Sequence, residues 1–346
     1  MHPQQITIAV DAMGGDKAPS AAVRGAVDAA RDLEVKVVLV GREQDIEREL
    51  EGLDPDPDKV SIVHAPDVVT MSDAPTVVFR KKRDASIMIA FSLAKEKKVH
   101  GVVSAGNSGA TMASAVFTLG MVPGLDRPAI AGCLPTPRGF TMVIDIGANI
   151  KCKPHQLFQF GIMGDVYLRH IDGIKKPRVG LLSIGEEDTK GNELVKLVHH
   201  MLKDSPLNFV GNVEGRDVFS GAVDLVICDG FVGNVLLKVS EGLGGALFDM
   251  IENEVQKLPS GRQGFETIQP AFLEAKKRID YEEVGGAPLL GINGVGIIGH
   301  GASTPKAIKN AVRVAQEMVL KRAEYFLAEG IKEYENVIKS LAFTMS

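Results

Sequence analysis

The sequence predicts an α/β protein built in three layers, with a mostly parallel β-sheet lying between two layers of helices. Short apolar runs rich in β-branched residues alternate along the chain with longer segments in which apolar residues recur at helical spacing. Strands joined through helices run parallel and are covered on both faces. The 346 residues are 45% hydrophobic and 24% charged, so the chain is long enough to bury a large core.

The first strand, loop and helix show the pattern. Residues 6–10 form an apolar, β-branched run, and Asp11, Gly14 and Gly15 then break it. Small apolar residues recur at helical spacing from Pro19 onward. Paired glycines let the backbone turn sharply near a ligand, and a helix N-terminus favours anions. The loop is therefore either an anion site or a tight turn without a ligand.

The same reasoning assigns the other elements. Further strands are expected at residues 35–40, 60–63, 102–104, 129–134, 141–146, 179–184, 209–210, 225–228 and 295–298. Further helices are expected at residues 43–50, 110–119, 156–168, 192–203, 235–258, 271–281, 305–327 and 331–341. A turn at residues 72–75 starts one more helix, and the polar residues 260–269 interrupt a helical pattern. The chain has no fixed-period repeat or Ser/Gly linker.

The composition excludes several classes of protein. The net charge of −5 gives no sign of nucleic-acid binding. Three scattered cysteines, Cys133, Cys152 and Cys228, are too few for a disulfide framework and fit a reducing cytoplasm. The N-terminus lacks the features of a secretory signal. Residues 101–125 are uncharged and long enough to cross a bilayer, but their Asn, Ser, Thr and Pro residues favour a strand, a polar loop and a buried helix.

Polar and glycine residues follow the carboxyl ends of most expected strands. The group comprises Gly14, Gly15, Asn107, Ser108, Asn149, Glu186, Lys190, Asp229, Asn234 and His300. In an open α/β sheet such ends lie along one edge, where ligands bind, so we expect these residues to share one pocket. Asp11, Asp145 and Asp229 could hold Mg²⁺ beside a phosphate, or bond N–H groups in turns.

Sequence motifs exclude several kinds of site. Residues 294–299 match the letters G-x-G-x-x-G, but they span an expected strand instead of following one, which argues against dinucleotide binding. No G-x-x-x-x-G-K-[ST] loop is present. Residues 106–109 resemble a nucleophile elbow without its spacing, so Ser108 could be a nucleophile, a helix cap or an anion ligand. His199 and His200 are adjacent on one helix and point in different directions, so we expect no metal site.

Taken together and in order, eight segments resemble the bacterial phosphate acyltransferase family known as PlsX. They are residues 10–16, 104–110, 145–149, 185–187, 211–217, 228–234, 285–291 and 300–301. Three positions depart from the family pattern. Lys151 stands where an acidic residue is expected, which puts an acidic role there in doubt, and Ser183 and Ser108 replace an expected Asn and Thr.

The resemblance implies transfer of a long-chain acyl group from acyl carrier protein to inorganic phosphate, giving acyl phosphate for phospholipid synthesis. It implies a homodimer without cofactor or metal, associated peripherally with the inner face of the cell membrane, where the membrane glycerol-3-phosphate acyltransferase is a possible partner. It also implies a fold like isocitrate and isopropylmalate dehydrogenases, with residues 1–346 as one catalytic unit and a protruding helical tip at about 240–282.

Three alternatives remain. A phosphotransacetylase-like enzyme would use coenzyme A thioesters as acyl donors. A decarboxylating dehydrogenase of the related fold would need NAD and Mg²⁺. A non-catalytic, membrane-recruited binding protein is disfavoured by the many polar loops.

The chemistry of the reaction suggests roles for the polar residues. Bound phosphate is already anionic, so we expect it to attack the thioester directly, without an acyl-enzyme. His300 is a candidate to protonate the leaving thiolate, and Lys190 to neutralise phosphate charge. The candidate catalytic residues are His300, Lys190 and Asn234. The candidate phosphate- and substrate-binding residues are Asp11, Gly14, Gly15, Asn107, Ser108, Asn149, Glu186 and Asp229.

Two basic clusters and one apolar segment are candidate interaction surfaces. Because acyl carrier protein is acidic, its docking residues are expected among Arg80, Lys81, Lys82 and Arg83, on one helical turn, and among Lys276, Lys277 and Arg278. A solvated face is the structural alternative for such charges. Residues 258–272, which include Phe265, Ile268 and Phe272, are a candidate membrane-touching tip.

Overall fold

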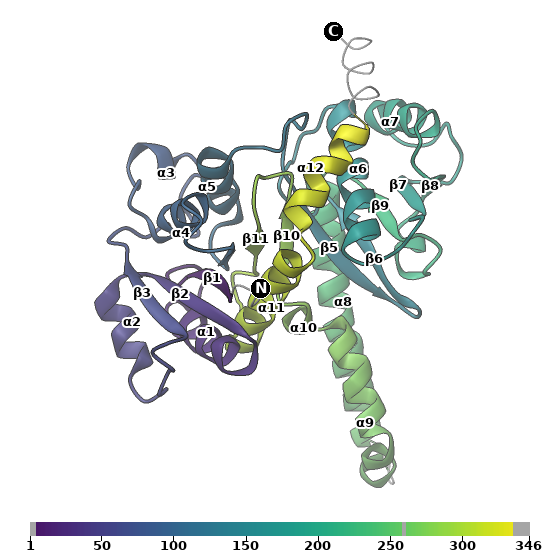
Figure 1. Cartoon of the computed structure of the whole chain (residues 1–346). Helices are drawn as coiled ribbons and strands as arrows, with labels where there is room; N and C mark the ends of the chain where they lie inside the picture. Colours follow the sequence, from purple (N-terminus) through teal and green to yellow (C-terminus); the bar gives the residue numbers. More distant parts are fainter. Residues whose placement is uncertain (1–4, 258–260, 335–346) are drawn as a thin grey trace.

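The computed structural model describes residues 5–257 and 261–334, and its strands form one eleven-stranded sheet in the order β3-β2-β1-β4-β11-β10-β5-β6-β9-β7-β8 (Figure 1). The strands are β1 (Ile6–Asp11), β2 (Val35–Gly41), β3 (Val60–His64), β4 (Gly101–Ser104), β5 (Ala129–Thr136), β6 (Gly139–Ile144), β7 (Val179–Leu182), β8 (Phe209–Val213), β9 (Leu225–Ile227), β10 (Ala287–Leu290) and β11 (Gly296–Ile298).

Helices connect these strands and cover the sheet. They are α1 (Ser20–Asp32), α2 (Glu43–Leu50), α3 (Val77–Arg80), α4 (Ser86–Lys95), α5 (Ser108–Leu119), α6 (Pro154–His170), α7 (Glu193–Lys203), the 3₁₀ helix η1 (Asp217–Phe219), α8 (Gly230–Lys257), α9 (Gly261–Ile279), α10 (Tyr281–Val284), α11 (Pro305–Leu320) and α12 (Ala323–Glu333). Alternate residues of β1 enter different buried clusters, Ile8 and Val10 on one face and Ala9 on the other. The three-layer prediction is therefore confirmed.

Strand direction divides the sheet into two parallel halves. β1, β2, β3, β4 and β11 run parallel, as do β6, β9, β7 and β8. Three antiparallel pairings, β11 with β10, β10 with β5 and β5 with β6, separate them. An odd number of reversals places the carboxyl ends of the two halves on opposite edges. The expectation that all the polar loops lie on one edge is therefore wrong.

Several boundaries differ from the expectation. The strand β10, which contains Pro288, was not expected at all. The helix α3 ends at Arg80, so the basic residues do not share a helical turn. The helix α9 includes residues 261–269, which we expected to interrupt it. Arg322 adopts a left-handed conformation with φ of 53° and separates α11 from α12, five residues before the expected end of the first of these helices. Residues 335–341 of the last expected helix lie outside the described residues.

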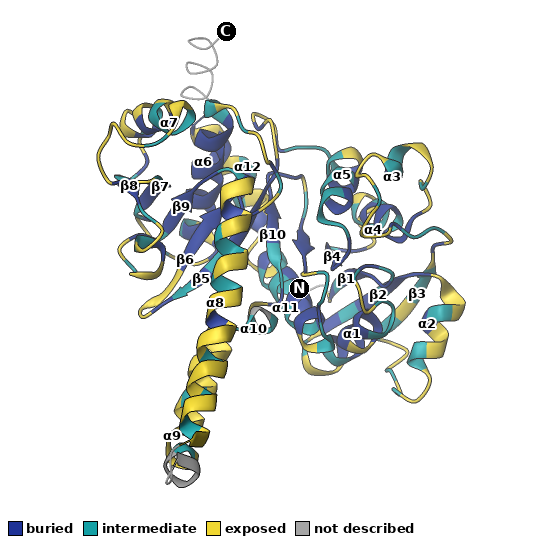
Figure 2. Cartoon of the chain, turned by 180° about the vertical axis from the view of Figure 1, so that it is seen from behind, coloured by how far each residue is buried: buried dark blue, intermediate teal, exposed yellow. Residues whose placement is uncertain are grey.

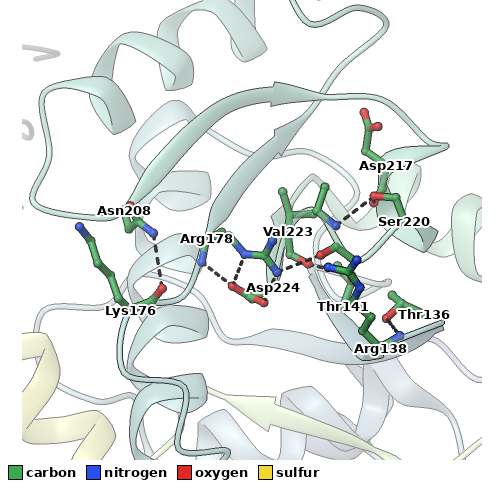
Figure 3. Close-up of polar contacts among 12 residues, drawn as sticks. Thr136, Arg138, Thr141, Lys176, Arg178, Asn208, Asp217, Ser220, Val223 and Asp224 are labelled. Atoms are coloured by element: carbon green, nitrogen blue, oxygen red, sulfur yellow. Dashed lines mark hydrogen bonds and ion pairs between the residues drawn. The ribbon is translucent and has the colours of Figure 1, made fainter.

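At the edge where β7 and β9 begin, an arginine joins the two strands (Figure 3). The Arg178 guanidinium donates from Nη2 to Asp224 Oδ1 at 2.8 Å and from Nε to Asp224 Oδ2 at 2.9 Å. Its Nη2 also donates to the Gly221 carbonyl at 2.9 Å. This bidentate pair aligns the starts of two strands whose opposite ends carry candidate site loops.

The helices α8 and α9 form a hairpin that projects from the body of the molecule (Figures 1 and 2). By length and composition alone, α8 is one described helix that could cross a membrane, and 11% of its most apolar 18-residue window is buried. Its exposed large apolar residues include Val239, Leu243, Leu247 and Met250. The residues 101–125, by contrast, form β4, a loop and α5 within the body, as expected.

The close contact of α1 with α11 gives a prediction about stability. A Cβ on Gly25 would lie 2.4 Å from the Pro305 carbonyl oxygen and 2.6 Å from Ile308 Cβ. We expect Gly25→Ala to lower the free energy of unfolding by about 1–3 kcal/mol because the helices must move apart. Urea denaturation of the purified variant measures this change.

The matched control is Gly242→Ala in α8, where an added Cβ meets no atom within 4 Å. It should leave the urea midpoint unchanged or raise it slightly, because alanine favours the helix by about 1 kcal/mol. Equal midpoints for the two variants would contradict the proposed packing constraint.

Candidate functional site

Asp11, at the carboxyl end of β1, organises the first half of the molecule. Its buried carboxylate accepts hydrogen bonds from Ser86 Oγ at 2.6 Å, from Ser104 Oγ at 2.8 Å and from the Met13 N–H at 3.2 Å. Burial raises the pKa of Asp11, and these hydrogen bonds oppose that shift. The carboxylate therefore joins β1, β4 and α4, and in this structure it contacts protein donors.

The glycine loop after β1 touches two other loops. A Cβ on Gly14 would lie 2.8 Å from the Gly106 nitrogen, so the loops after β1 and β4 are in close contact. Gly15 has φ of 105°, a conformation that favours glycine, and a Cβ there would lie 3.1 Å from the Gly301 carbonyl oxygen. The Asp16 N–H donates to that oxygen at 2.8 Å. The loops after β1, β4 and β11 therefore meet.

Asn107 caps α5 and holds a neighbouring loop. Its Oδ1 accepts from the Ala110 N–H at 3.0 Å. Its Nδ2 donates to the carbonyls of Met71 at 3.1 Å and Asp73 at 2.9 Å. The amide is thus engaged with protein. In the part of the chain that the structure describes, the Ser108 and Gly109 N–H groups and the Ser108 hydroxyl have no hydrogen-bond partner. They are therefore available to donate to an anion at this helix start.

A cavity of about 590 Å³ opens beside these loops. It is lined by Met13, Gly15, Asp16, Ala18, Arg42, Asp67, Val68, Val69, Thr70, Met71 and Lys82. Lys82 Nζ donates to the Val68 carbonyl at 2.7 Å and pairs with Asp73 at 2.5 Å. The hydrogen bond from Lys82 lowers the pKa of Asp73 to about 2, so the Asp73 carboxyl is ionised at neutral pH. Lys82 is therefore part of the cavity wall.

His300 lies in the loop after β11, next to Gly301. Its Nδ1 accepts from the Ala302 N–H at 3.1 Å, and its carbonyl accepts from Ser303 Oγ at 2.6 Å. The hydrogen bond at Nδ1 fixes the orientation of the exposed imidazole beside the glycine loop.

A second group of predicted site residues surrounds Asp145, at the carboxyl end of β6. The Asp145 carboxylate accepts the N–H groups of Gly147, at 3.1 Å, and Asn149, at 2.6 Å, and burial raises its pKa. Asn149 Nδ2 donates to Asp145 at 3.0 Å and to the Pro128 carbonyl at 2.8 Å, so this buried amide is also engaged. Asn234 is exposed on α8, with Oδ1 3.7 Å from a Cβ placed on Gly147.

Asp229 begins α8 in this second group. Its Oδ1 accepts from the Val232 N–H at 2.9 Å, and the Gly230 N–H donates to the Asn149 carbonyl at 2.8 Å. Asp229 therefore acts as the helix cap, in agreement with the turn interpretation of such aspartates.

Glu186 and Lys190 lie in the loop after β7. Glu186 pairs with Arg216 at 3.2 Å, and Arg216 also pairs with Glu214 at 2.9 Å. The carboxylates of Glu186, Glu214 and Asp217 lie within 4.8 Å of one another, but Arg216 already balances two of these charges. Lys190 is exposed, and its stem lies against Gly185.

Sequence reasoning missed the residue that holds this loop. The buried His199 ring lies 3.0 Å from Asn212 Oδ1 through Nδ1 and 3.3 Å from Asp188 Oδ1 through Nε2. Asn212 in turn donates to the Glu187 carbonyl at 2.8 Å. Two adjacent histidines on a helix gave no signal of this role, because the partners come from a different strand and loop.

The structure thus divides the expected pocket. The first half gathers Asp11, Gly14, Gly15, Asn107, Ser108 and His300, whereas Asn149, Asp229, Asn234, Glu186 and Lys190 lie at the opposite edge. All residues that line the cavity fall between Met13 and Lys82. The cavity thus adjoins the first group alone, and the roles of all these residues stay predictions. We take the first group as the better candidate for a reacting centre.

Comparisons with known proteins add to this geometry. A family model described as fatty acid synthesis protein matches residues 6–324. A phosphate acyltransferase of Pelotomaculum thermopropionicum is 50% identical over 328 residues, covering 95% of this chain and 96% of the relative. One from Syntrophotalea carbinolica is 51% identical over 324 residues, covering 92% of each chain.

Solved structures share the fold. A phosphotransacetylase from Streptococcus pyogenes superposes with a TM-score of 0.61 at 13% identity, covering 92% of this chain and 95% of that one. The EutD phosphotransacetylase from Staphylococcus aureus gives a TM-score of 0.57 at 14% identity, covering 90% and 94%. At such low identity these structures show the fold alone. Because the family model matches most of its length and the relatives share half of its residues, the chain belongs to the fatty acid synthesis protein family.

Proposed function

We propose that this protein transfers an acyl group from a thioester to inorganic phosphate, giving acyl phosphate. The observation that carries the proposal is the identity of about one half, over more than nine-tenths of the chain, with relatives named phosphate acyltransferase. The first group of site residues supports it, because glycine loops and a helix start supply anion donors beside a cavity.

The proposed step is a direct displacement. A phosphate oxygen attacks the thioester carbonyl carbon, a tetrahedral oxyanion forms, and the carbon–sulfur bond breaks to give acyl phosphate and a thiolate that takes up a proton. The Ser108 and Gly109 N–H groups and the Ser108 hydroxyl hold the phosphate at the positive end of α5. Asp11 and Asn107 hold the surrounding loops, and His300 is the candidate proton donor to the thiolate.

The predicted site residues at the opposite edge of the sheet stay candidates, but under a stricter condition. They could act in the same chemical step only on a substrate that extends between the two edges; these residues are Lys190, Asn234, Glu186 and Asp229. We therefore centre the proposed step on the first group. No cofactor or metal enters it.

The proposed acyl donor is a long-chain thioester of acyl carrier protein, and the product would enter phospholipid synthesis. Arg80 and Lys81 support this choice, because they are exposed, have no hydrogen-bond or ion-pair partner among residues 5–257 and 261–334, and precede Lys82 of the cavity wall. Lys276, Lys277 and Arg278 lie on the projecting hairpin instead, so we rank them as the secondary docking cluster.

The exposed apolar residues of α8 support a homodimer through the hairpin, and exposed apolar residues in the middle of α9 support membrane contact at the inner face of the cell. Phe265 and Phe272 stack edge to face at 5.2 Å, and Phe272 also contacts Phe248 at 4.9 Å. These rings hold the hairpin together, whereas Ile268 and Leu273 are 52% and 48% exposed. The latter pair is therefore the better candidate for contact with lipid or with the membrane glycerol-3-phosphate acyltransferase.

The first prediction from this proposal concerns the acyl donor. Purified protein should form acyl phosphate from an acyl carrier protein thioester and phosphate, and turn over the coenzyme A thioester less efficiently. Arg80→Glu/Lys81→Glu should raise the apparent KM for the protein thioester roughly 5- to 10-fold at low salt, with kcat unchanged, because rim charges act on association. Initial rates across a salt series measure this effect.

Lys175→Glu/Lys176→Glu is the matched control, since it reverses two adjacent exposed lysines in the other half. An equal increase in KM for the control variant would contradict the assignment of Arg80 and Lys81 as the docking surface. A preference for coenzyme A thioesters would favour the phosphotransacetylase-like alternative, and absence of acyl phosphate from either donor would refute the proposed function.

A second prediction separates direct attack from an acyl-enzyme. Ser108→Ala should lower kcat/KM roughly tenfold to 100-fold through loss of one hydrogen bond to the phosphate. Loss of a true nucleophile would instead cost several orders of magnitude. Rapid quenching followed by intact mass measurement should find no acylated protein.

Ser114→Ala on the same helix is the control, because the Ser114 hydroxyl is buried without a partner in the described part of the chain. Its activity should match that of the wild type. An acyl adduct that forms on the wild type and not on Ser108→Ala would overturn direct attack.

A third prediction tests the membrane tip. Ile268→Asp/Leu273→Asp should reduce flotation with anionic liposomes several-fold, because charged groups at these exposed positions oppose burial in lipid. Leu197→Asp, at a 48% exposed position on α7, is the control and should float like the wild type. Unchanged flotation of the tip variant would exclude this segment as the contact.

A further inference from the structure

The cavity beside the glycine loop has the size and lining for a long, polar and flexible ligand. Its volume of about 590 Å³ falls within the range of small-molecule sites. The side chains of Met13, Val68 and Val69 provide apolar wall, and Asp16 and Asp67 provide carboxylates. No hydrogen bond or ion pair to the side chain of Asp16 or Asp67 is present within the described residues, so both can accept from a ligand.

Of the two cations that line this cavity, Arg42 is the one that can still bind a ligand. Its Nε donates to the Pro66 carbonyl at 3.2 Å, which orients the guanidinium at the start of α2. The two terminal nitrogens have no partner in the parts of the chain that the structure describes. The ammonium of Lys82, by contrast, is held by Val68 and Asp73. A planar, oriented guanidinium suits two oxygens of a phosphate or phosphodiester.

The cavity also leads to the proposed reacting loops. Gly15 lines it and contacts Gly301, beside His300. Thr70 and Met71 line it, and the Met71 carbonyl accepts from Asn107, the residue before Ser108. A ligand in this cavity therefore lies against the loops that flank the proposed phosphate site.

We propose that this cavity binds the 4′-phosphopantetheine arm that carries the acyl thioester, with Arg42 on its phosphate. This inference rests on the proposed function, which requires a thioester at the same loops. The two amide N–H groups of the arm match the carboxylates of Asp16 and Asp67, and its dimethyl group matches the apolar wall. Acyl carrier protein and coenzyme A both carry this arm, so the site accounts for the shared part of either donor.

Binding of the arm itself tests the site without relying on catalysis. The probes are 4′-phosphopantetheine and pantetheine, which lacks the phosphate, titrated calorimetrically into the wild type and Arg42→Ala. We expect Arg42→Ala to weaken binding of 4′-phosphopantetheine roughly tenfold and leave pantetheine binding nearly unchanged. Arg48→Ala, an exposed arginine farther along α2 paired with Asp45, is the matched control and should bind both probes like the wild type.

A second variant fills the cavity. Val68→Trp should weaken both probes at least roughly tenfold because the side chain occupies the space that they need. Circular dichroism melting of each variant checks its fold. Wild-type protein that binds neither probe, equal weakening of the two probes by Arg42→Ala, or unchanged binding by a folded Val68→Trp would each overturn the site.

Kinetics with two donors separate this inference from the proposed function. Arg42→Ala should raise the KM for thioesters of acyl carrier protein and of coenzyme A by similar factors, with kcat retained, because both share the arm. If the probes bind as expected but no thioester yields acyl phosphate, the site stands and the proposed function fails. If acyl phosphate forms and Arg42→Ala leaves both KM values unchanged, the proposed function stands and the site is overturned.

Discussion

Each half of the sheet is built around a buried carboxylate at the carboxyl end of a strand, Asp11 after β1 and Asp145 after β6. Desolvation disfavours their charge, and hydrogen bonds from hydroxyl and N–H donors oppose it. Those donors belong to the loops that follow, so each carboxylate fixes a loop path. Loss of either group would leave several buried donors unpaired, at a cost of about 1–3 kcal/mol each.

The reversal of strand direction determines where the two carboxylates, and the loops that they hold, lie relative to each other. The strand β10 is four residues long and pairs antiparallel with both of its neighbours, and the β5–β6 hairpin adds a third reversal. The two sets of carboxyl ends therefore lie on opposite edges of one continuous sheet. The rule that ligands bind at the carboxyl ends of strands applies within each half, and in the first half it leads to the cavity and the start of α5.

Local pattern was enough to predict most elements, because a strand such as residues 35–40 and a helix such as residues 43–50 carry their own periodicity. It could not predict β10, whose four residues include a proline and whose pairing depends on distant strands. The site was harder. Asn107 and Asn149 look like ligands in sequence, yet their amides bond to protein groups distant in the chain. Which polar atoms remain free to bind a ligand depends on the tertiary structure. Arg42 is an example, because only its place in the folded cavity distinguishes it from other surface arginines.

The helix α8 connects the second centre to the projecting hairpin. In its first turn, Gly233 packs so closely on the Asp145 carbonyl oxygen that an added Cβ would lie 1.9 Å away. The same helix continues without interruption to Lys257, which at 1.5 Å per residue extends about 40 Å. Because the helix is continuous, the packing of its first turn fixes the direction of its axis and therefore the position of its far end. The loop around Asp145 therefore sets where the exposed apolar face of the hairpin points, and any partner on that face is oriented relative to Asn234. This arrangement gives the loop around Asp145 a structural role that does not depend on direct contact with the reacting atoms.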